Sequence, residues 1–80
     1  MEPNWQELHD RLTRLTMKKL RPLGSRWFNG CLGGESRKAE YVDTMVSQMR
    51  YWWRSCSEQG GRDRVRNVMA DLELAEQEVG

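Results

Sequence analysis

The chain has 80 residues, of which 38% are hydrophobic and 31% are charged, and its formal net charge at pH 7 is +1. This length allows a single domain, and the composition is that of an ordinary small globular domain. No apolar run approaches the roughly 18 residues that a membrane-spanning helix needs, and the opening MEPN is unlike a signal peptide. We therefore expect an intracellular protein without a membrane partner.

The first predicted helix begins after Asn4, whose side chain can cap it. Glu7, three residues further on, completes a pattern typical of a capping box. The apolar side chains of this segment recur every three or four residues and predict one buried stripe: Trp5, Leu8, Leu12 and Leu15.

A second helical stripe follows Thr16, which is a second candidate N-cap. The stripe consists of Met17, Leu20, Leu23 and Trp27. Pro22 complicates this segment, because proline costs about 3 kcal/mol inside a helix but is tolerated in its first turn. Two interpretations remain, a short turn over residues 16–20 before a helix that starts near Arg21, or one kinked helix, and we favour the first.

Glycine pairs set the expected boundaries of the last two helices. Asn29-Gly30 and Gly33-Gly34 predict a break in the helix, after which Ser36 can cap a third helix that ends at Gly60-Gly61. A fourth helix is expected over about 62–79. The apolar stripes of these helices are Tyr41, Val42, Met45, Val46, Met49, Trp52, Trp53 and Cys56, and then Val65, Val68, Met69, Leu72, Ala75 and Val79. The expected fold is all-α, a small bundle of about four helices forming one domain over 1–80.

Catalytic and metal-binding residues are scarce. Cys31, Cys56 and the single histidine, His9, are too few for a disulfide framework or a four-ligand zinc site, so we expect structural thiols, no metal and no cofactor. His9 lies off the apolar stripe, near Glu7 and Asp10, which is a weak acid–base group on an exposed face. No catalytic motif is present, and we predict that the protein is not an enzyme.

The charge is unevenly distributed along the chain. All thirteen lysines and arginines lie between Arg11 and Arg66, among five acidic residues, so this span carries +8. The first ten residues carry −3, and residues 67–80 carry −4 without a base. A basic middle between acidic ends indicates a patch for an anionic partner, although a solvated surface of mixed charge would give the same numbers.

The sequence SRKAE at residues 36–40 combines two cations with a predicted helix start. A helix N-terminus presents unpaired N–H groups and a partial positive charge, which together favour an anion. Arg37 and Lys38 oppose the helix dipole there, and a phosphate in front of them would relieve that repulsion. The alternative is that both cations pair with Glu35, Glu40 or another nearby acid.

The run from Leu15 to Val46 resembles the SAP-type motif, a helix–extended loop–helix module of many chromosomal and nucleic-acid-processing proteins. Leu15-Thr16 matches the opening of the family pattern, and Lys38-Ala39-Glu40-Tyr41-Val42 matches the start of its second helix. Ser36 stands where the family has a glycine, Pro22 falls within the first helix, and the segment between the helices is a few residues longer.

The resemblance implies a monomeric module that contacts duplex DNA phosphates with little sequence specificity and tethers a larger protein to DNA, in the nucleus if the organism is eukaryotic. The SAP-like motif would span about 15–47, followed by the extra helix at about 62–79. Family members contact DNA through the start of the second helix and the preceding loop, with help from the first helix. Transferred to this chain, the implied contact residues are Ser36, Arg37 and Lys38, with nearby charge from Lys18, Lys19, Arg21 and Arg26.

The alternative function is a helical protein–protein interaction domain that uses the acidic, amphipathic last helix as its docking surface. An exposed apolar patch containing Trp52 or Trp53 would favour it. Tryptophans can stack on bases, but at helical spacing among Met and Val they are expected in the core. Because neighbours on a helix point about 100° apart, one of these two should lie at the core edge or against another helix.

Overall fold

The computed structural model describes residues 2–28, 37–55 and 59–77 and forms four helices within them. In chain order these are α1 (Trp5–Arg14), α2 (Met17–Trp27), α3 (Lys38–Ser55) and α4 (Gln59–Gln77). The described ranges contain no strand, and the predicted all-α bundle of about four helices is confirmed.

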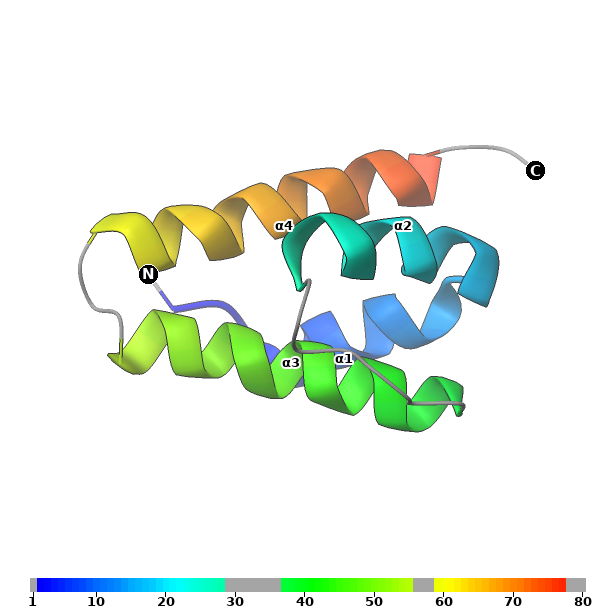
Figure 1. Ribbon diagram of the computed structural model, residues 1–80, viewed down its shortest axis with the longest axis horizontal. Helices are drawn as coiled ribbons and strands as arrows, with labels where there is room; N and C mark the ends of the chain where they lie inside the picture. Colours follow the sequence, from blue (N-terminus) through cyan, green and yellow to red (C-terminus); the bar gives the residue numbers. More distant parts are fainter. Residues whose placement is uncertain (1, 29–36, 56–58, 78–80) are drawn as a thin grey trace.

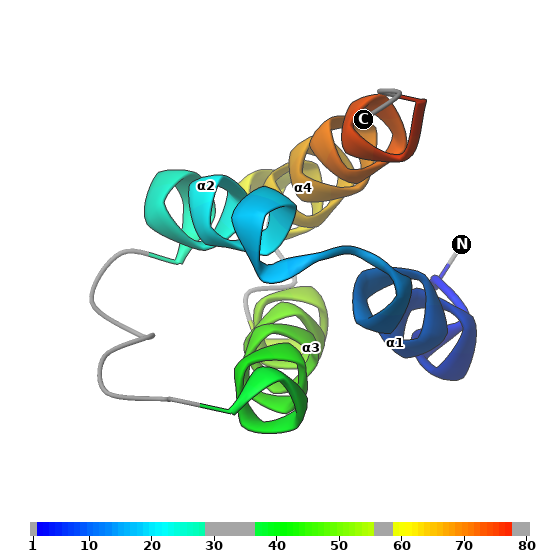
Figure 2. The same cartoon turned by 90° about the vertical axis from the view of Figure 1, so that its right-hand side faces the viewer.

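The helices are arranged as antiparallel neighbours (Figure 1). The main contacts join α1 to α3, α3 to α4, and α2 to α4. The starts of α2 and α3 therefore lie at the same end of the bundle as the last turns of α1 and α4, and this end faces the viewer in Figure 2. Cations at the two helix starts consequently share one end of the molecule.

The core is formed by the predicted apolar stripes. Each helix contributes buried side chains, and those with the largest volumes among the fully buried ones are Phe28, Leu8, Leu12, Leu20, Met45, Met49, Leu72, Val42, Val65 and Val68. Among the hydrophobic residues that are buried in the described ranges, Phe28 alone was not predicted from the stripes. Cys56 and Val79, which were, lie outside the described residues.

Two of the three predicted N-caps lie in the described residues, and both occupy the expected position, but only one of them uses its side chain. The Asn4 Oδ1 accepts a hydrogen bond from the Glu7 N–H at 3.1 Å and caps α1 as expected. Thr16 occupies the corresponding position at α2 in an extended conformation, without a side-chain cap bond. Its carbonyl accepts the N–H groups of Lys19 and Leu20, at 3.0 and 2.9 Å.

The favoured interpretation of Pro22 is wrong, because α2 runs through it without a break. As the sixth residue of the helix, Pro22 lacks the N–H that would bond to the Lys18 carbonyl. Leu20, Leu23 and Gly24 are nevertheless buried on this helix. Tertiary packing of that face holds a helix that local preference would interrupt.

The predicted boundary at Gly60-Gly61 is also wrong. α3 ends at Ser55, and both glycines lie in the first turn of α4, which starts at Gln59. A glycine pair interrupts helix propensity equally whether it ends one helix or begins the next. The stripe that starts at Val65 cannot distinguish the two cases, because its first residue lies a turn further on.

A substitution of Gly60 by alanine tests the new boundary. We expect the free energy of unfolding to rise by about 0.4–1 kcal/mol, because alanine restricts the unfolded chain and suits a helix. Apart from the surrounding helical backbone and chain neighbours, no atom lies within 4 Å of the position that the Cβ would take. Urea unfolding measures the change. A loss of stability would instead place Gly60 in a left-handed turn that ends α3.

Candidate nucleic-acid interface

The start of α3 lies at the predicted SRKAE junction. Lys38 is the first residue of the helix, and the Arg37 carbonyl accepts the Tyr41 N–H at 3.0 Å. The backbone of Arg37 therefore stands at the boundary of the helix. The predicted contact and cap residue Ser36 lies outside the described residues, as does Cys31.

Of the two cations at this junction, Arg37 is exposed and Lys38 is half-buried. The Arg37 side chain is 83% exposed, and its Nε lies 3.9 Å from the Glu40 Oε1, so the alternative of pairing with Glu40 is realised in part. An exposed pair is worth only about 0–1 kcal/mol, so a phosphate can replace Glu40 at little cost. Among the described residues, Lys38 has no ion-pair partner.

The helix α2 carries four cations and no acidic residue. Lys18 and Lys19 stand in its first turn, where the helix dipole opposes positive charge. Lys18 and Arg21 are three residues apart and share one exposed face. Neither forms an ion pair with another residue in the described ranges.

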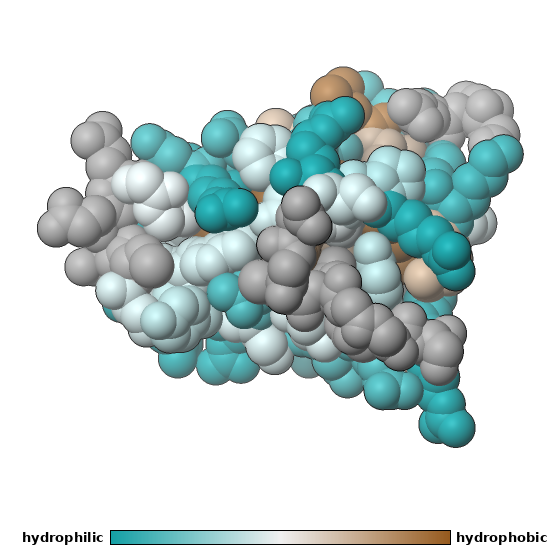
Figure 3. All heavy atoms as spheres, viewed as in Figure 1, coloured by the Kyte–Doolittle hydropathy of each residue, from teal (hydrophilic) through white to brown (hydrophobic). Residues whose placement is uncertain are grey.

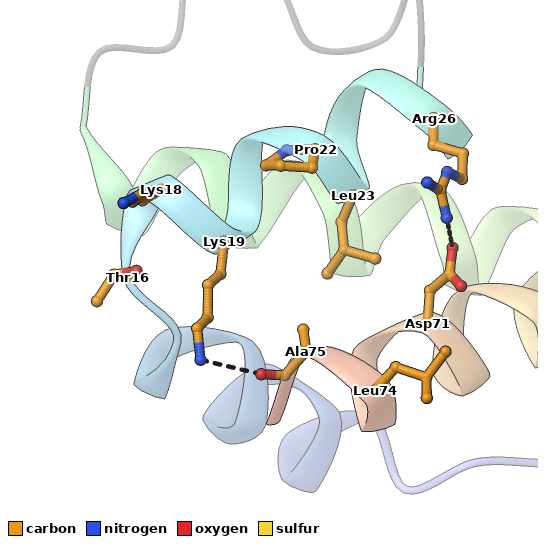
Figure 4. A pocket seen from close by; sticks show the side chains of 9 residues that line it. All are labelled: Thr16, Lys18, Lys19, Pro22, Leu23, Arg26, Asp71, Leu74 and Ala75. Atoms are coloured by element: carbon orange, nitrogen blue, oxygen red, sulfur yellow. Dashed lines mark hydrogen bonds and ion pairs between the residues drawn. The ribbon is translucent and has the colours of Figure 1, made fainter. Parts of the chain in front are cut away.

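The other two cations of α2 point toward α4, as Figure 4 shows. The Lys19 Nζ donates to the Ala75 carbonyl at 3.1 Å, and the Arg26 Nη1 donates to the Asp71 Oδ2 at 2.9 Å. Between these two bridges lies a groove of about 450 Å³, whose apolar lining is Pro22, Leu23, Leu74 and Ala75.

The predicted contact residues therefore separate into two groups. The first, which we call the basic end, comprises Lys18, Arg21, Arg37 and Lys38. These residues come from α2 and α3 near the helix starts at the common end of the bundle (Figures 1 and 2). The second group is Lys19 and Arg26, whose side chains are held by α4.

Asp71 anchors the contact between α2 and α4, and the sequence analysis did not identify it. Its Oδ2 accepts hydrogen bonds from the Trp27 Nε1 at 2.6 Å and from Arg26. The bond from Trp27, followed by Arg26, lowers the pKa of the Asp71 carboxyl. The only signal in the sequence was the opposite charge of the two segments, which does not specify partners 44 and 45 residues away.

Acidification is expected to destabilise the fold through Asp71 and Glu76. The Arg11 side chain lowers the pKa of Glu76, as Trp27 and Arg26 lower that of Asp71. A carboxyl group whose pKa is lowered by folding adds stability above its unfolded pKa and loses it as the pH falls through the folded value. The loss should begin near the ordinary pKa values of 3.8 for Asp and 4.5 for Glu and continue below them.

Urea unfolding between about pH 6 and about pH 3 measures this loss. The double variant Asp71→Asn, Glu76→Gln should be less stable than the wild type near neutral pH and should show a shallower decline on acidification. An identical decline in both proteins would contradict the assignment of these two carboxylates.

Both adjacent tryptophans of α3 are buried, with exposed fractions of 8% for Trp52 and 4% for Trp53. Trp52 stacks on Phe28 with the ring centroids 5.2 Å apart, and Trp53 meets Trp5 edge-on at 6.4 Å. The two rings thus pack against different aromatic residues, as expected for neighbours that point about 100° apart on a helix. They are not placed to stack on bases, and they do not form an exposed apolar patch.

Three arginines of α4 cover these tryptophans. The Arg64 guanidinium lies 4.5 Å from the Trp52 ring centroid, and those of Arg62 and Arg66 lie 5.1 and 5.6 Å from that of Trp53. Cation–π contacts at exposed sites contribute about 0.5–1 kcal/mol each. These arginines therefore have a packing role that the cations of the basic end lack.

His9 is paired with an acidic residue of another helix. The His9 Nε2 lies 2.7 Å from the Asp43 Oδ1, which joins α1 to α3 near the surface. In the described part of the chain, no three His, Cys, Asp or Glu residues are grouped to hold a metal ion. Within the same residues, no helix is long and apolar enough to cross a membrane.

Comparison with protein-family models, with curated proteins and with solved structures finds no match to this chain. The SAP-type resemblance stays a prediction, and the case for a function rests on the positions and contacts of the residues described above.

Proposed function

We propose that this domain binds duplex DNA through the basic end, by contacts to phosphates with little sequence preference, and tethers a larger protein to DNA. The observation that carries the proposal is the placement of accessible cations around two helix starts at one end of the bundle. The resemblance of residues 15–46 to the SAP-type motif points to the same residues.

The electrostatics of this end favour a polyanion. Each helix start adds a partial positive charge and unpaired N–H groups to the lysines and arginines around it. The first turn of α2 has no acid to offset Lys18 and Lys19, and the first turn of α3 has only Glu40. Phosphates supply the missing negative charge, and such contacts position a protein on DNA without reading its sequence.

A titration at several salt concentrations tests the proposal. If the four cations of the basic end each neutralise one phosphate, log affinity should fall against log salt with a slope of about −3.6. Affinity should then drop about 150-fold between roughly 50 and 200 mM salt. Fluorescence anisotropy with two labelled duplexes of unrelated sequence measures both the slope and the sequence preference.

Three results would contradict this function. They are an absence of binding at low salt, binding that is insensitive to salt, and a large difference between the two duplexes. The first two results would exclude phosphate contacts as the basis of binding. The third would show that the protein recognises bases, which the cations of the basic end do not explain.

One observation favours the second candidate, a protein–protein interaction domain. Leu74 on α4 is 60% exposed and lines the groove between α2 and α4. Tyr51 is the other large hydrophobic residue that is exposed in the described ranges. The buried state of Trp52 and Trp53 weighs against this candidate, and Figure 3 shows hydrophobic colour only in small areas of the face in view.

A Leu74→Ser variant separates the two functions. It should leave DNA binding unchanged if the basic end is the interface.

A further inference from the structure

The C-terminal half of α4 binds cations from α1 and α2. Residues 71–77 contain three acidic side chains and no basic one. Glu76 accepts two hydrogen bonds from the Arg11 guanidinium, at 2.6 and 3.0 Å, and Asp71 accepts one from Arg26. Lys19 donates to the carbonyl of Ala75 near the end of the same helix.

Two of these cations, Lys19 and Arg26, belong to the set predicted to contact DNA. A carboxylate and a phosphate compete for the N–H donors and the positive charge of a guanidinium, and the Asp71 carboxylate both takes an Nη1 donor of Arg26 and offsets its charge. In the free protein, α4 thus holds two cations, Lys19 and Arg26, that could otherwise bind a phosphate.

We infer that the acidic half of α4 is an intramolecular competitor for the phosphates, and that Asp71 lowers DNA affinity by holding Arg26. This inference rests on the proposed function and concerns Arg26, which lies near the C-terminal end of α2 and would extend the phosphate contacts beyond the basic end. Figure 4 shows Arg26 turned to Asp71 at one end of the groove, and Lys19 turned to Ala75 at the other.

The contact between Arg26 and Asp71 suits reversible competition. The Arg26 side chain is 65% exposed, whereas that of Asp71 is 19% exposed. The guanidinium can therefore leave without opening the core, and Asp71 remains bonded to the Trp27 Nε1 when it does. Exposed ion pairs are weak, so the competition should lower DNA affinity about two- to fivefold and not abolish binding.

The test is an Asp71→Asn variant in the salt titration. Asparagine keeps an oxygen to accept the Trp27 bond but removes the charge that holds Arg26. Affinity at low salt should rise about two- to fivefold, and the slope should become steeper by about 0.9 as Arg26 gains a phosphate contact. Circular dichroism should show that the variant remains folded at the assay temperature.

Glu73→Gln is the matched control. It removes the same charge two residues away on α4, and Glu73 forms no ion pair or side-chain hydrogen bond with a described residue. A second control makes the Asp71→Asn change in an Arg26→Ala background, where no guanidinium remains to be released. Both controls should leave the slope unchanged.

The outcomes separate the inference from the function. The competition would be overturned if DNA affinity rose equally in the Asp71→Asn and Glu73→Gln variants, or if it still rose when Arg26 was absent. Either result would attribute the rise to the change in net charge. Binding by the wild type with no change in the Asp71→Asn variant would overturn it as well, and would leave the proposed function standing. If neither protein binds the duplex at low salt, the proposed function fails and the inference fails with it.

Discussion

Replacement of Phe28 by alanine is expected to lower the free energy of unfolding by about 3–5 kcal/mol. The Phe28 side chain is fully buried and stacks on Trp52 with an interplanar angle of 21°. At about 0.05–0.15 kcal/mol per residue, a domain of this size has only about 4–12 kcal/mol in total. The variant should therefore lose a large fraction of its stability.

The effect should be large because Phe28 links the end of α2 to α3. Its N–H donates to the Gly24 carbonyl at the end of α2, its ring packs on α3, and the preceding Trp27 carbonyl accepts a hydrogen bond from Arg64 of α4. Loss of the ring leaves a cavity between elements that are far apart in sequence.

Urea unfolding monitored by tryptophan fluorescence measures this change, and Tyr51→Ala is the matched control. Tyr51 is also aromatic, but it is 58% exposed, so its removal should change stability by no more than about 0.5 kcal/mol. A cost below about 1 kcal/mol for Phe28→Ala would contradict the packing of the end of α2 on α3.

The largest effect on binding is expected from the double variant Arg37→Ala, Lys38→Ala. Removal of two phosphate contacts should reduce the salt slope by about 1.8, which is half of the value expected for the wild type. The fold should survive, because neither side chain belongs to the buried set of α3. Loss of positive charge at a helix N-terminus is expected to stabilise α3 slightly.

The variant Arg62→Ala, Arg66→Ala is the matched comparison, since it also removes two cations. These residues cover Trp53, so their loss should cost about 1–2 kcal/mol of stability and leave the salt slope nearly unchanged. The reverse result, with a reduced slope here and no change at positions 37 and 38, would place the interface on α4. Unchanged binding in both variants would exclude both surfaces as the main contact.

Periodicity predicted most of the core, because its cause is local. In α1, Leu8 and Leu12 are buried, as is Leu15 directly after the helix. A helix with 3.6 residues per turn places such a series on one side wherever the partner lies. Phe28 was missed because it follows the last residue of its helix and precedes a turn signal at Asn29-Gly30. Phe28 is buried because it packs on Trp52, and the residues next to Phe28 in the sequence do not indicate that contact.

The two wrong boundaries have different causes. Pro22 is unfavourable within a helix, but the buried face formed by Leu20 and Leu23 outweighs that cost. The glycines at positions 60 and 61 interrupt helix propensity without indicating on which side the helix lies.

The sequence indicated which cations could form the candidate site, but not which of them are bound by other residues of the protein. Charge along the chain and the SRKAE junction indicated which cations to consider. The sequence could not show that Lys19 and Arg26 are held by α4 while Lys18 and Arg21 are not. That division depends on which face of α2 meets α4, and hence on contacts between residues more than forty positions apart.

An NMR titration of the protein with a short DNA duplex at low salt tests the central claim most directly. Phosphate binding at the basic end predicts that the backbone amides of residues 17–21 and 37–40 shift together, with one common dissociation constant. The amides of residues 62–66 in α4 should stay nearly unchanged. Shifts concentrated at residues 62–66, or no shifts at a severalfold excess of DNA, would contradict the account.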